Sequence, residues 1–249
     1  MGLLSVLLEE CEAVDSVTFG ITTFNRPKQL NKLVVSIEHR YPKAIIRIAD
    51  NGDRQERIEK SNVVREVLPF DSGASACRNW LMRTVETEFL VLLDDDFVFI
   101  PDTSIEAMVD VMDCCQMVGV VGGLVRERIA QADPTYDFEG MSIVPTKSAM
   151  RKTSKGIRYR ICQYVRMFVL VRKEVAETTQ WQEDLKIGGE HRSFFFDLKE
   201  AGIWGVAWTP DSAIRHEIYE GDSKYKEFRA RGSKFEQIAF DRLRRRASG

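Results

Sequence analysis

The sequence has no apolar run that approaches the roughly 20 residues that a helix needs to cross a lipid bilayer. Internal repeats and low-complexity linkers are also absent from it. Its charges nearly cancel, because 36 Lys and Arg stand against 38 Asp and Glu and leave a formal net charge of −2. This balance gives no general attraction to a polyanion, so we expect no nucleic-acid partner.

Cysteine is scarce, with five in 249 residues. An odd number cannot all pair within one chain, and Cys114 and Cys115 are adjacent in an apparent helix, which is a poor geometry for a mutual disulfide. No Cys-x-x-Cys or Cys/His spacing indicates zinc. We therefore expect free thiols and a reducing, cytoplasmic location.

The two ends of the chain differ in charge. Residues 1–14, MGLLSVLLEECEAV, have a short apolar run with no basic residue before it, unlike a signal peptide, and we expect a docked helix or strand. Residues 218–249 form a basic tail that is expected to be helical. A solvated helix is one interpretation of the tail. The other is a helix on an anionic membrane surface, which would place the protein at the inner face of the membrane.

Hydrophobic residues make up 44% of the chain, enough for a sizeable core, and we expect residues 1–249 to form a single domain. In the first half, short apolar runs alternate with helical patterns, which is typical of βαβ units around a parallel sheet. The expected strands are 17–23, 44–50, 62–70, 88–94 and 118–125. Helices are expected over 25–40, after Asp71 and after Pro101, the last with a capping box of Thr103 and Glu106.

The second half is less regular. Residues 128–160 are rich in turn-forming and basic residues and predict a mobile loop or hairpin, whereas 164–174 predicts a strand. A helix should end at Gly202, and a strand and turn should follow and end at His216. The resulting plan is an α/β sheet whose second part closes over the first.

Polar clusters follow four of the expected strands, at 22–25, 50–53, 71–75 and 94–96. In parallel α/β sheets, ligands bind beyond the carboxyl ends of the strands, so these clusters predict a binding site. The last cluster, Asp94-Asp95-Asp96, is the most informative, because adjacent carboxylates resist simultaneous ionisation. A cation is therefore expected at that point.

Four motifs, TTFNRP, ADNGD, DSGASACRNWLM and FLVLLDDDF, occur in an order that resembles a GT-A glycosyltransferase. More narrowly, they resemble family 2 and the related beta-1,4-N-acetylgalactosaminyltransferase-like group, whose second half resembles GGEHRSFFFDLKEAG and TPDSAIRH. The resemblance covers about 17–217. It implies a Rossmann-like GT-A fold with a mostly parallel central sheet flanked by helices. In that fold, 17–127 would bind a nucleotide sugar and 128–217 would form a smaller acceptor and catalytic part.

The resemblance also implies roles for single residues. The nucleotide would lie near Thr22 and Arg26, with Asp50 facing the uracil. The base and ribose would be lined by residues of the third motif, namely Asp71, Ser72, Arg78 and Asn79. The helix that starts there would present N–H groups to phosphate, with an ordinary tight strand-to-helix turn as the alternative.

The acid triplet matches the family's DxD motif. Asp94 would face ribose or, through water, a metal, and Asp95 would belong to the nucleotide-sugar site. Asp96 would ligate the expected cofactor, Mn²⁺ or Mg²⁺. His216, one of only three histidines, would complete the metal shell, since imidazole suits Mn²⁺. An ordinary surface or core histidine is the alternative.

The implied reaction is the inverting transfer of a sugar from a UDP-hexose or UDP-N-acetylhexosamine to a glycan or lipid-linked hydroxyl. A carboxylate must remove the acceptor's proton, and where the family commonly has Gly-Glu-Asp this chain has Gly189-Glu190-His191. Glu190 is the first candidate for this base, His191 the second and Asp197 the third. Gly189 would let the acceptor approach the backbone closely. Trp181 is a candidate for stacking on an acceptor sugar.

Three other functions remain open. LLDDDFV also fits the nucleophile motif of haloacid-dehalogenase-like phosphatases, but those enzymes carry it on their first strand, and GDSKYKE has Lys226 where a later acid belongs. A nucleotidyltransferase would need a glycine-rich, lysine-bearing loop that GITTFNRP lacks. The third alternative is a non-catalytic nucleotide-sugar-binding module with the same fold.

Overall fold

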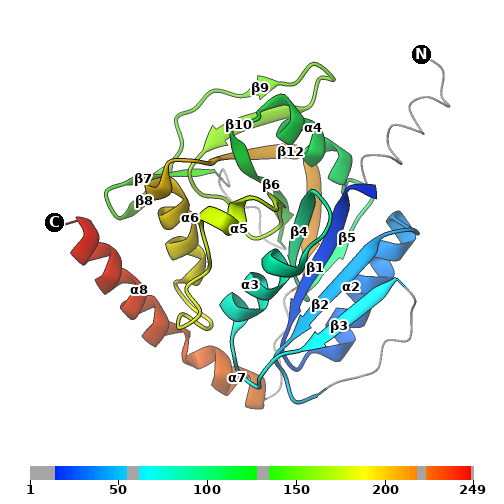
Figure 1. Ribbon diagram of the computed structural model, residues 1–249, viewed down its shortest axis with the longest axis vertical. Coiled ribbons are helices and arrows are strands. Elements are labelled where there is room, and N and C mark those ends of the chain that lie inside the picture. The colour runs from blue at the N-terminus through cyan, green and yellow to red at the C-terminus, as the bar shows by residue number, and fades with distance from the viewer. Residues whose placement is uncertain (1–14, 55–61, 128–134, 218–222, 248–249) are drawn as a thin grey trace.

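The computed structural model describes residues 15–54, 62–127, 135–217 and 223–247. One large sheet runs through these residues, with helices on both of its faces (Figure 1). Residues 1–14, for which we expected a docked helix or strand, lie outside the described residues, as do the first residues of the segment 128–160.

The first half of the sheet is parallel, in the spatial order β3-β2-β1-β4. These strands are β1 (Val17–Thr23), β2 (Ile45–Asp50), β3 (Val63–Val67) and β4 (Phe89–Asp94). All seven residues of β1 and five of the six in β4 are buried, as expected for strands covered on both faces. The carboxyl ends of these strands therefore meet at one edge of the sheet.

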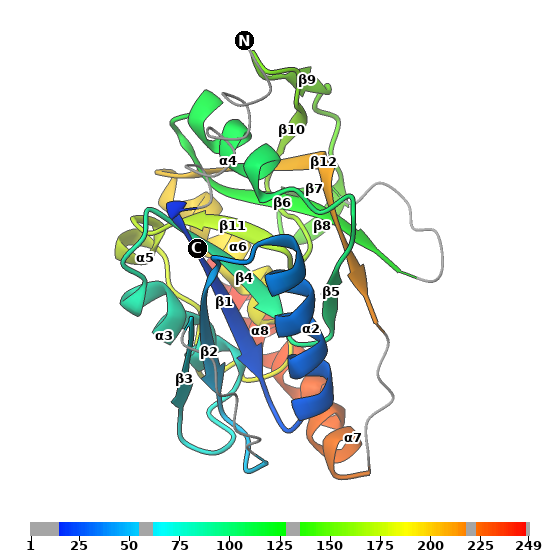
Figure 2. The same ribbon diagram turned by 90° about the vertical axis from the view of Figure 1, so that its right-hand side faces the viewer.

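Two helices cover this half from opposite faces (Figure 2). Helix α2 (Pro27–Arg40) begins with a proline, whose missing N–H costs nothing in the first turn. Its buried residues form one apolar stripe: Leu30, Leu33, Val34 and Ile37. Helix α3 (Ala74–Thr84) covers the other face and starts after Gly73, whose φ of 94° suits glycine better than any residue with a side chain.

The second half of the sheet mixes strand directions. Its strands are β5 (Phe97–Phe99), β6 (Val118–Arg126), β9 (Arg151–Lys152), β10 (Arg158–Cys162), β11 (Val169–Arg172) and β12 (Gly205–His216). β11 runs antiparallel between β4 and β6, and β6 pairs in parallel with β12. β5 pairs with the end of β12 and sets His216 opposite Phe97, directly beside the acid triplet.

The remaining elements surround this sheet. They are the hairpin of β7 (Tyr136–Glu139) and β8 (Ser142–Pro145), and the helices α4 (Ile105–Cys114), α5 (Val175–Thr178), α6 (Glu190–Ala201), α7 (Ser223–Ala230) and α8 (Gly232–Ala247). Helix α6 ends at Gly202, as predicted, where a φ of 66° and two backbone hydrogen bonds close the last turn. Among the described helices, none is both long and apolar enough to cross a membrane.

The predicted α/β fold with a mostly parallel sheet flanked by helices is confirmed. Two details differ. The strand expected over 164–174 is shortened to β11, because Phe168 has a φ of 128° that interrupts the extended backbone. The strand and turn expected before His216 form one strand, β12, with a bulge between Trp208 and Ala213. For 128–160 the sequence predicts a loop or a hairpin, and the described part contains the hairpin of β7 and β8 as well as β9, which pairs with the start of β10.

The capping box expected before α4 is wrong. The N-cap is Ser104, whose Oγ accepts the N–H of Ala107 at 3.1 Å. The hydroxyl of Thr103 instead donates to the carbonyl of Ala213 at 2.5 Å and so ties this turn to β12. Glu106 contacts Ser104 Oγ at 2.9 Å rather than a threonine backbone.

The basic tail forms α7 and α8. Helix α8 packs on α6 through Ala239 and Leu243, each only 1% exposed (Figure 1). Arg242 of α8 pairs with Asp184, and Arg246 pairs with Asp197. Two of the tail's positive charges are thus paired with carboxylates of the same chain. Contact of the tail with a membrane stays a prediction.

Candidate functional site

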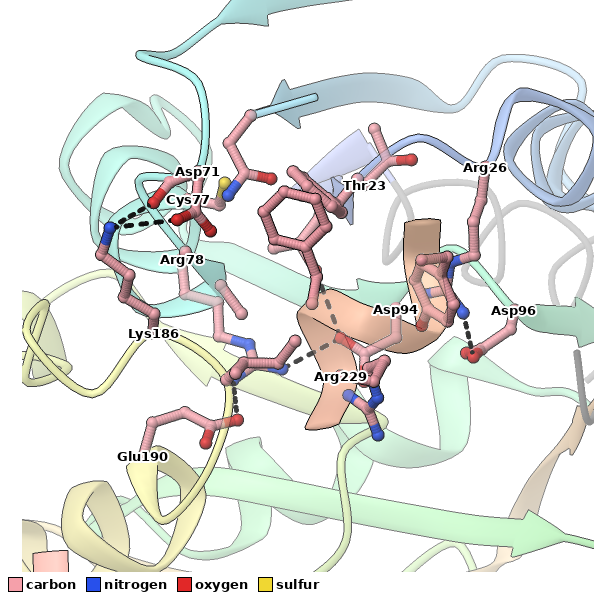
Figure 3. A pocket seen from close by; sticks show the side chains of 18 of the residues that line it. Thr23, Arg26, Asp71, Cys77, Arg78, Asp94, Asp96, Lys186, Glu190 and Arg229 are labelled. Carbon is pink, nitrogen blue, oxygen red and sulfur yellow. Dashed lines mark hydrogen bonds and ion pairs between the residues drawn. The ribbon is translucent and has the colours of Figure 1, made fainter. Parts of the chain in front are cut away.

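A pocket opens beyond the carboxyl ends of the parallel strands (Figure 3). It is lined by residues that the sequence motifs singled out: Thr22, Arg26, Asp71, Arg78, Asp94, Asp96, Glu190 and His216. These residues come from segments far apart in the chain, and the convergence of parallel strand ends brings them together.

The three aspartates span the end of β4 and the turn that follows it, and their side chains do not all face the same way. Asp94 faces the pocket and accepts hydrogen bonds from Arg78 at 3.0 Å and from Thr22 at 3.2 Å. Asp96 faces the same pocket. Asp95 is fully buried behind them and accepts a hydrogen bond from Thr23 Oγ1 at 2.6 Å. Burial raises the pKa of the Asp95 carboxyl to about 7. Asp95 therefore lies beneath the pocket and does not line it, contrary to its expected place in the site.

Arg26 supplies the cation that the triplet was expected to require. Its guanidinium pairs with Asp95 and donates to Asp96 at 2.7 Å. The ring of Tyr225, from α7, lies 5.0 Å from the guanidinium carbon. Arg26 is thus held between two carboxylates and an aromatic ring.

His216 completes this side of the pocket. Its Nε2 lies 3.5 Å from Asp96 Oδ2, and its Nδ1 lies 3.5 Å from Glu127 Oε1. Burial alone would raise the pKa of Asp96, but His216 and Arg26 hold it at about 2. Asp96 in turn raises the pKa of His216. The pairing of β5 with β12 creates this contact, because it places residues 97 and 216 opposite each other.

Glu190 is the first residue of α6. It follows Gly189, which has a left-handed φ of 75°, and its carboxylate accepts a hydrogen bond from Arg78 at 3.3 Å. Gly189 lines a second pocket beside the first, and a Cβ there would lie 2.5 Å from that of Ala239, so a side chain at this position would collide with α8. Glu190 lines the first pocket and also this second one. It therefore stands at the junction of two adjoining pockets.

The two other candidates for a base are engaged in other contacts, although His191 also lines the second pocket. The Nε2 of His191 lies 2.7 Å from the carbonyl of Val165, and the rings of Tyr164 and Phe195 pack against the imidazole at 5.1 Å. Burial lowers the pKa of His191, which keeps the ring neutral. Asp197 lies further along α6 and pairs with Gln182 at 2.8 Å and with Arg246 of α8.

Trp181 is in the core and not at a sugar-binding surface, which corrects the expected stacking role. Its ring is 2% exposed and stacks on Phe194 with 4.2 Å between centroids and 4° between planes. On the other side, the guanidinium carbon of Arg78 lies 4.6 Å from the ring centroid. Asn79 is also buried and makes two hydrogen bonds of 2.8 Å to the backbone of Trp181. Its Nδ2 donates to the Trp181 carbonyl, and its Oδ1 accepts from the Trp181 N–H. Trp181 and Asn79 therefore support Arg78 from behind the pocket.

Asp50 and Ser72 do not line the pocket either. The carboxylate of Asp50 is 1% exposed, accepts the N–H of Gly52 at 2.8 Å and pairs with Arg65. It thus shapes the turn after β2, and the neighbouring Asn51 lines the pocket in its place.

The sequence profile of glycosyl transferase family 2 matches residues 18–177, which is more than half of the chain. The chain belongs to glycosyl transferase family 2. Mouse (Mus musculus) beta-1,4 N-acetylgalactosaminyltransferase 1 is 40% identical over 111 residues, which cover 45% of this chain and 21% of that protein. Mouse beta-1,4 N-acetylgalactosaminyltransferase 2 is 35% identical over 121 residues, covering 49% and 24%. The chain matches only about a fifth to a quarter of the length of these relatives.

Solved structures show the same fold. GalNAc-T7, solved with UDP, GalNAc and Mn²⁺, superposes with a TM-score of 0.65 at 15% identity, over 82% of this chain and 44% of that one. TarS 1-349 of S. aureus, solved with UDP-GlcNAc, gives a TM-score of 0.56 at 13% identity, over 83% and 59%. At such low identities the likeness establishes the GT-A fold and nothing about ligands.

The metal ion expected from the sequence would need oxygen or nitrogen ligands that face this pocket. Asp96 Oδ2 and His216 Nε2 lie 3.5 Å apart and could both reach one cation. Asp94, the third expected ligand, is turned toward Arg78 and Thr22. Within the described ranges, no three His, Cys, Asp or Glu side chains converge as a closed metal site. Two protein donors fit a hard cation that takes its other ligands from phosphate and water.

Several lining residues of this family 2 site lie outside the motifs that predicted it. They are Lys186, Ile187, Tyr225, Phe228, Arg229 and Arg231. Four of the six belong to α7 or the turn after it, in the tail that its composition marked only as basic. Arg231 binds Asp71 through two hydrogen bonds of 2.6 and 2.9 Å, and Lys186 donates to the Asp71 carbonyl at 2.6 Å. Asp71 thus joins the tail to the wall of the pocket.

Proposed function

We propose that this family 2 chain is a metal-dependent, inverting glycosyltransferase domain that uses a nucleotide sugar, with a UDP-hexose or UDP-N-acetylhexosamine as the first choice. The observation that carries the proposal is the junction formed by Arg78, which contacts Asp94 and Glu190, two carboxylates that each line both pockets. The names of the relatives support an N-acetylhexosamine donor, and the ligands named with the solved neighbours support UDP.

The donor would occupy the first pocket. Its nucleoside would lie toward the side of Asn51 and Asp71, and its diphosphate toward Asp96 and Arg26. Mn²⁺ or Mg²⁺, held by Asp96 and His216, would neutralise charge on the diphosphate leaving group when bound. Thr22 and Arg78 keep the carboxylate of Asp94 oriented at the floor of this pocket.

Glu190 is our candidate for the base. It would accept the proton of an acceptor hydroxyl while that oxygen bonds to the anomeric carbon and the bond from this carbon to the donor's phosphate oxygen breaks. Attack from the face opposite the leaving group inverts the anomeric configuration. Arg78 positions the carboxylate, since its guanidinium is 3% exposed and cannot move freely.

The acceptor would enter the second pocket, which meets the first at Glu190. Tyr164 lines this second pocket together with three basic residues, Arg166, Arg192 and Arg229. An aromatic ring and several hydrogen-bond donors suit the hydroxyl-rich surface of a glycan, alone or linked to a lipid. The cytoplasmic location expected from the sequence stays a prediction.

A donor screen tests the function. The protein is incubated with Mn²⁺ and UDP-, GDP- or CMP-sugars, and the released nucleotide is measured with and without glycan acceptors. Release of UDP supports the transferase. Phosphate release from simple monoesters would instead support the phosphatase, and donor binding without any release would support the non-catalytic module.

A further inference from the structure

Arg229 is a basic residue at the junction of the two pockets. It lines both pockets, as Asp94 and Glu190 also do, and Figure 3 shows its guanidinium on the same side of the cavity as Asp94. The residue is exposed. In the part of the chain that the structure describes, no carboxylate forms an ion pair with it.

The other arginines and lysines of the first pocket are already paired with carboxylates. Arg26 pairs with Asp95 and Asp96, and Arg78 pairs with Asp94 and Glu190. The other two basic residues, Lys186 and Arg231, both pair with the carboxylate of Asp71. A diphosphate that enters this pocket therefore meets carboxylates, which repel it, and basic side chains that are already paired with those carboxylates. It needs a cationic side chain that has no carboxylate partner. Among the described lining residues, Arg229 is the arginine that meets this need.

Helix α7 holds Arg229 in place from both sides. Before it, the ring of Phe228 packs edge-on against Phe24, with centroids 4.8 Å apart. After it, Arg231 is fixed by its two hydrogen bonds to Asp71. These contacts join α7 to two loops of the nucleotide-binding half, so the side chain between them stays at the mouth of the pocket.

We propose that Arg229 binds the phosphate groups of the nucleotide donor, which makes α7 part of the donor site. The inference rests on the function proposed above. A guanidinium presents a planar fork of N–H donors that matches phosphate oxygens, and it keeps its charge at any physiological pH. Arg229 would hold the diphosphate before transfer and offset its charge as the leaving group departs.

Isothermal titration with UDP and with uridine, in the presence of Mn²⁺, tests this inference. The variants are Arg229→Gln and the matched control Arg245→Gln, which removes an exposed arginine of α8 that lines neither pocket. Loss of a charged hydrogen bond should weaken UDP binding at least about tenfold in Arg229→Gln. Uridine, which has no phosphate, should bind as it does to the wild type, and Arg245→Gln should bind both probes normally.

Equal UDP affinities of Arg229→Gln and the wild type would overturn the inference. So would an equal loss of UDP and uridine binding, which indicates a deformed pocket. An unchanged UDP affinity with a raised KM for the acceptor would assign Arg229 to the acceptor and also overturn it. If the wild-type protein binds no UDP, the proposed function itself fails, and this result is distinct from a failure of Arg229 alone.

Discussion

Arg78 donates a hydrogen bond to Glu190 at 3.3 Å, although the two residues belong to helices on different halves of the sheet. The same guanidinium contacts Asp94 at 3.0 Å. It lies over the ring of Trp181, which in turn stacks on Phe194. A buried arginine supported in this way fixes the separation between two carboxylates, Asp94 and Glu190, that both stand where the two pockets meet. That fixed geometry is what a displacement at a sugar carbon requires.

Replacing Glu190 by glutamine should abolish most transfer without changing donor binding. The amide keeps the size of the side chain and can still accept from Arg78, but it cannot take a proton. General-base catalysis typically contributes about 10²–10⁴-fold, so kcat should fall by that order. The measurements are kcat with the best donor and acceptor pair and the Kd of UDP by titration.

Asp197→Asn is the control for this change, since it also neutralises a carboxylate of α6. We expect its kcat to stay within about threefold of the wild type, because the carboxylate lies against Gln182 and Arg246 and lines neither pocket. Full turnover by Glu190→Gln would remove Glu190 as the base and leave His191 as the next candidate.

Asp96→Asn and His216→Ala should each weaken Mn²⁺ binding in the presence of UDP at least about tenfold, because each removes one of two protein donors. Free Mn²⁺ can be counted by electron paramagnetic resonance, independently of turnover. His216→Ala is the cleaner variant, since Asp96→Asn also releases Arg26. Asp113→Asn, an exposed change on α4, should leave the titration unaltered. Wild-type Mn²⁺ affinity in both site variants would exclude this pair as the ligands.

The sequence was sufficient to predict that the strand ends converge. Apolar runs followed by polar clusters defined four parallel strands, and parallel strands must end at one edge, so Thr22, Asp71, Asp94 and their neighbours meet there. The burial of Asp95 between Asp94 and Asp96 did not follow from the sequence, because Asp95 and Asp96 lie in the turn after β4, where the alternation of side chains along a strand does not apply. A motif that includes all three residues does not convey this distinction.

Contacts between distant segments could not be predicted in the same way. Asn79 is a polar residue within a motif and Trp181 an amphipathic residue upstream of one, and only the packing of α3 on the segment before α6 shows that both are buried. The role of α7 was missed because its composition is that of a solvated helix. Phe228 and Arg231 identify it as a wall of the pocket only once their partners, Phe24 and Asp71, are known.

Trp181→Ala should destabilise the fold by about 3–5 kcal/mol, the usual cost of truncating a large buried aromatic residue. Urea denaturation at neutral pH measures this change, with Met117→Ala as the control because Met117 is 68% exposed. Trp181→Phe keeps a ring against Phe194 and should lose less stability. Its KM for the acceptor should remain near that of the wild type. A large increase in KM with little loss of stability would restore the stacking role.

Asp71 should make the stability of the protein depend on pH. The hydrogen bonds from Arg231, with a smaller effect of Lys186, lower the pKa of this carboxyl in the folded protein below its ordinary value of 3.8. The unfolded chain therefore binds the proton first as the pH falls. The stabilisation is fully present above the ordinary pKa and is lost as the pH drops through the lower, folded value.

Comparison of the wild type with Asp71→Asn by urea denaturation at a series of pH values tests this dependence. The ion pair of Asp71 and Arg231 is partly exposed, so the free energy of unfolding of the wild type should exceed that of Asp71→Asn by no more than about 1 kcal/mol at pH 7. This difference should shrink as the pH falls below about 4, the range in which a free carboxyl becomes protonated. Arg231→Gln should lose the same pH dependence, because it removes the partner and leaves the carboxyl. If the difference in the free energy of unfolding between the wild type and Asp71→Asn stays constant down to pH 2, Asp71 stabilises the turn through its shape and not through its charge.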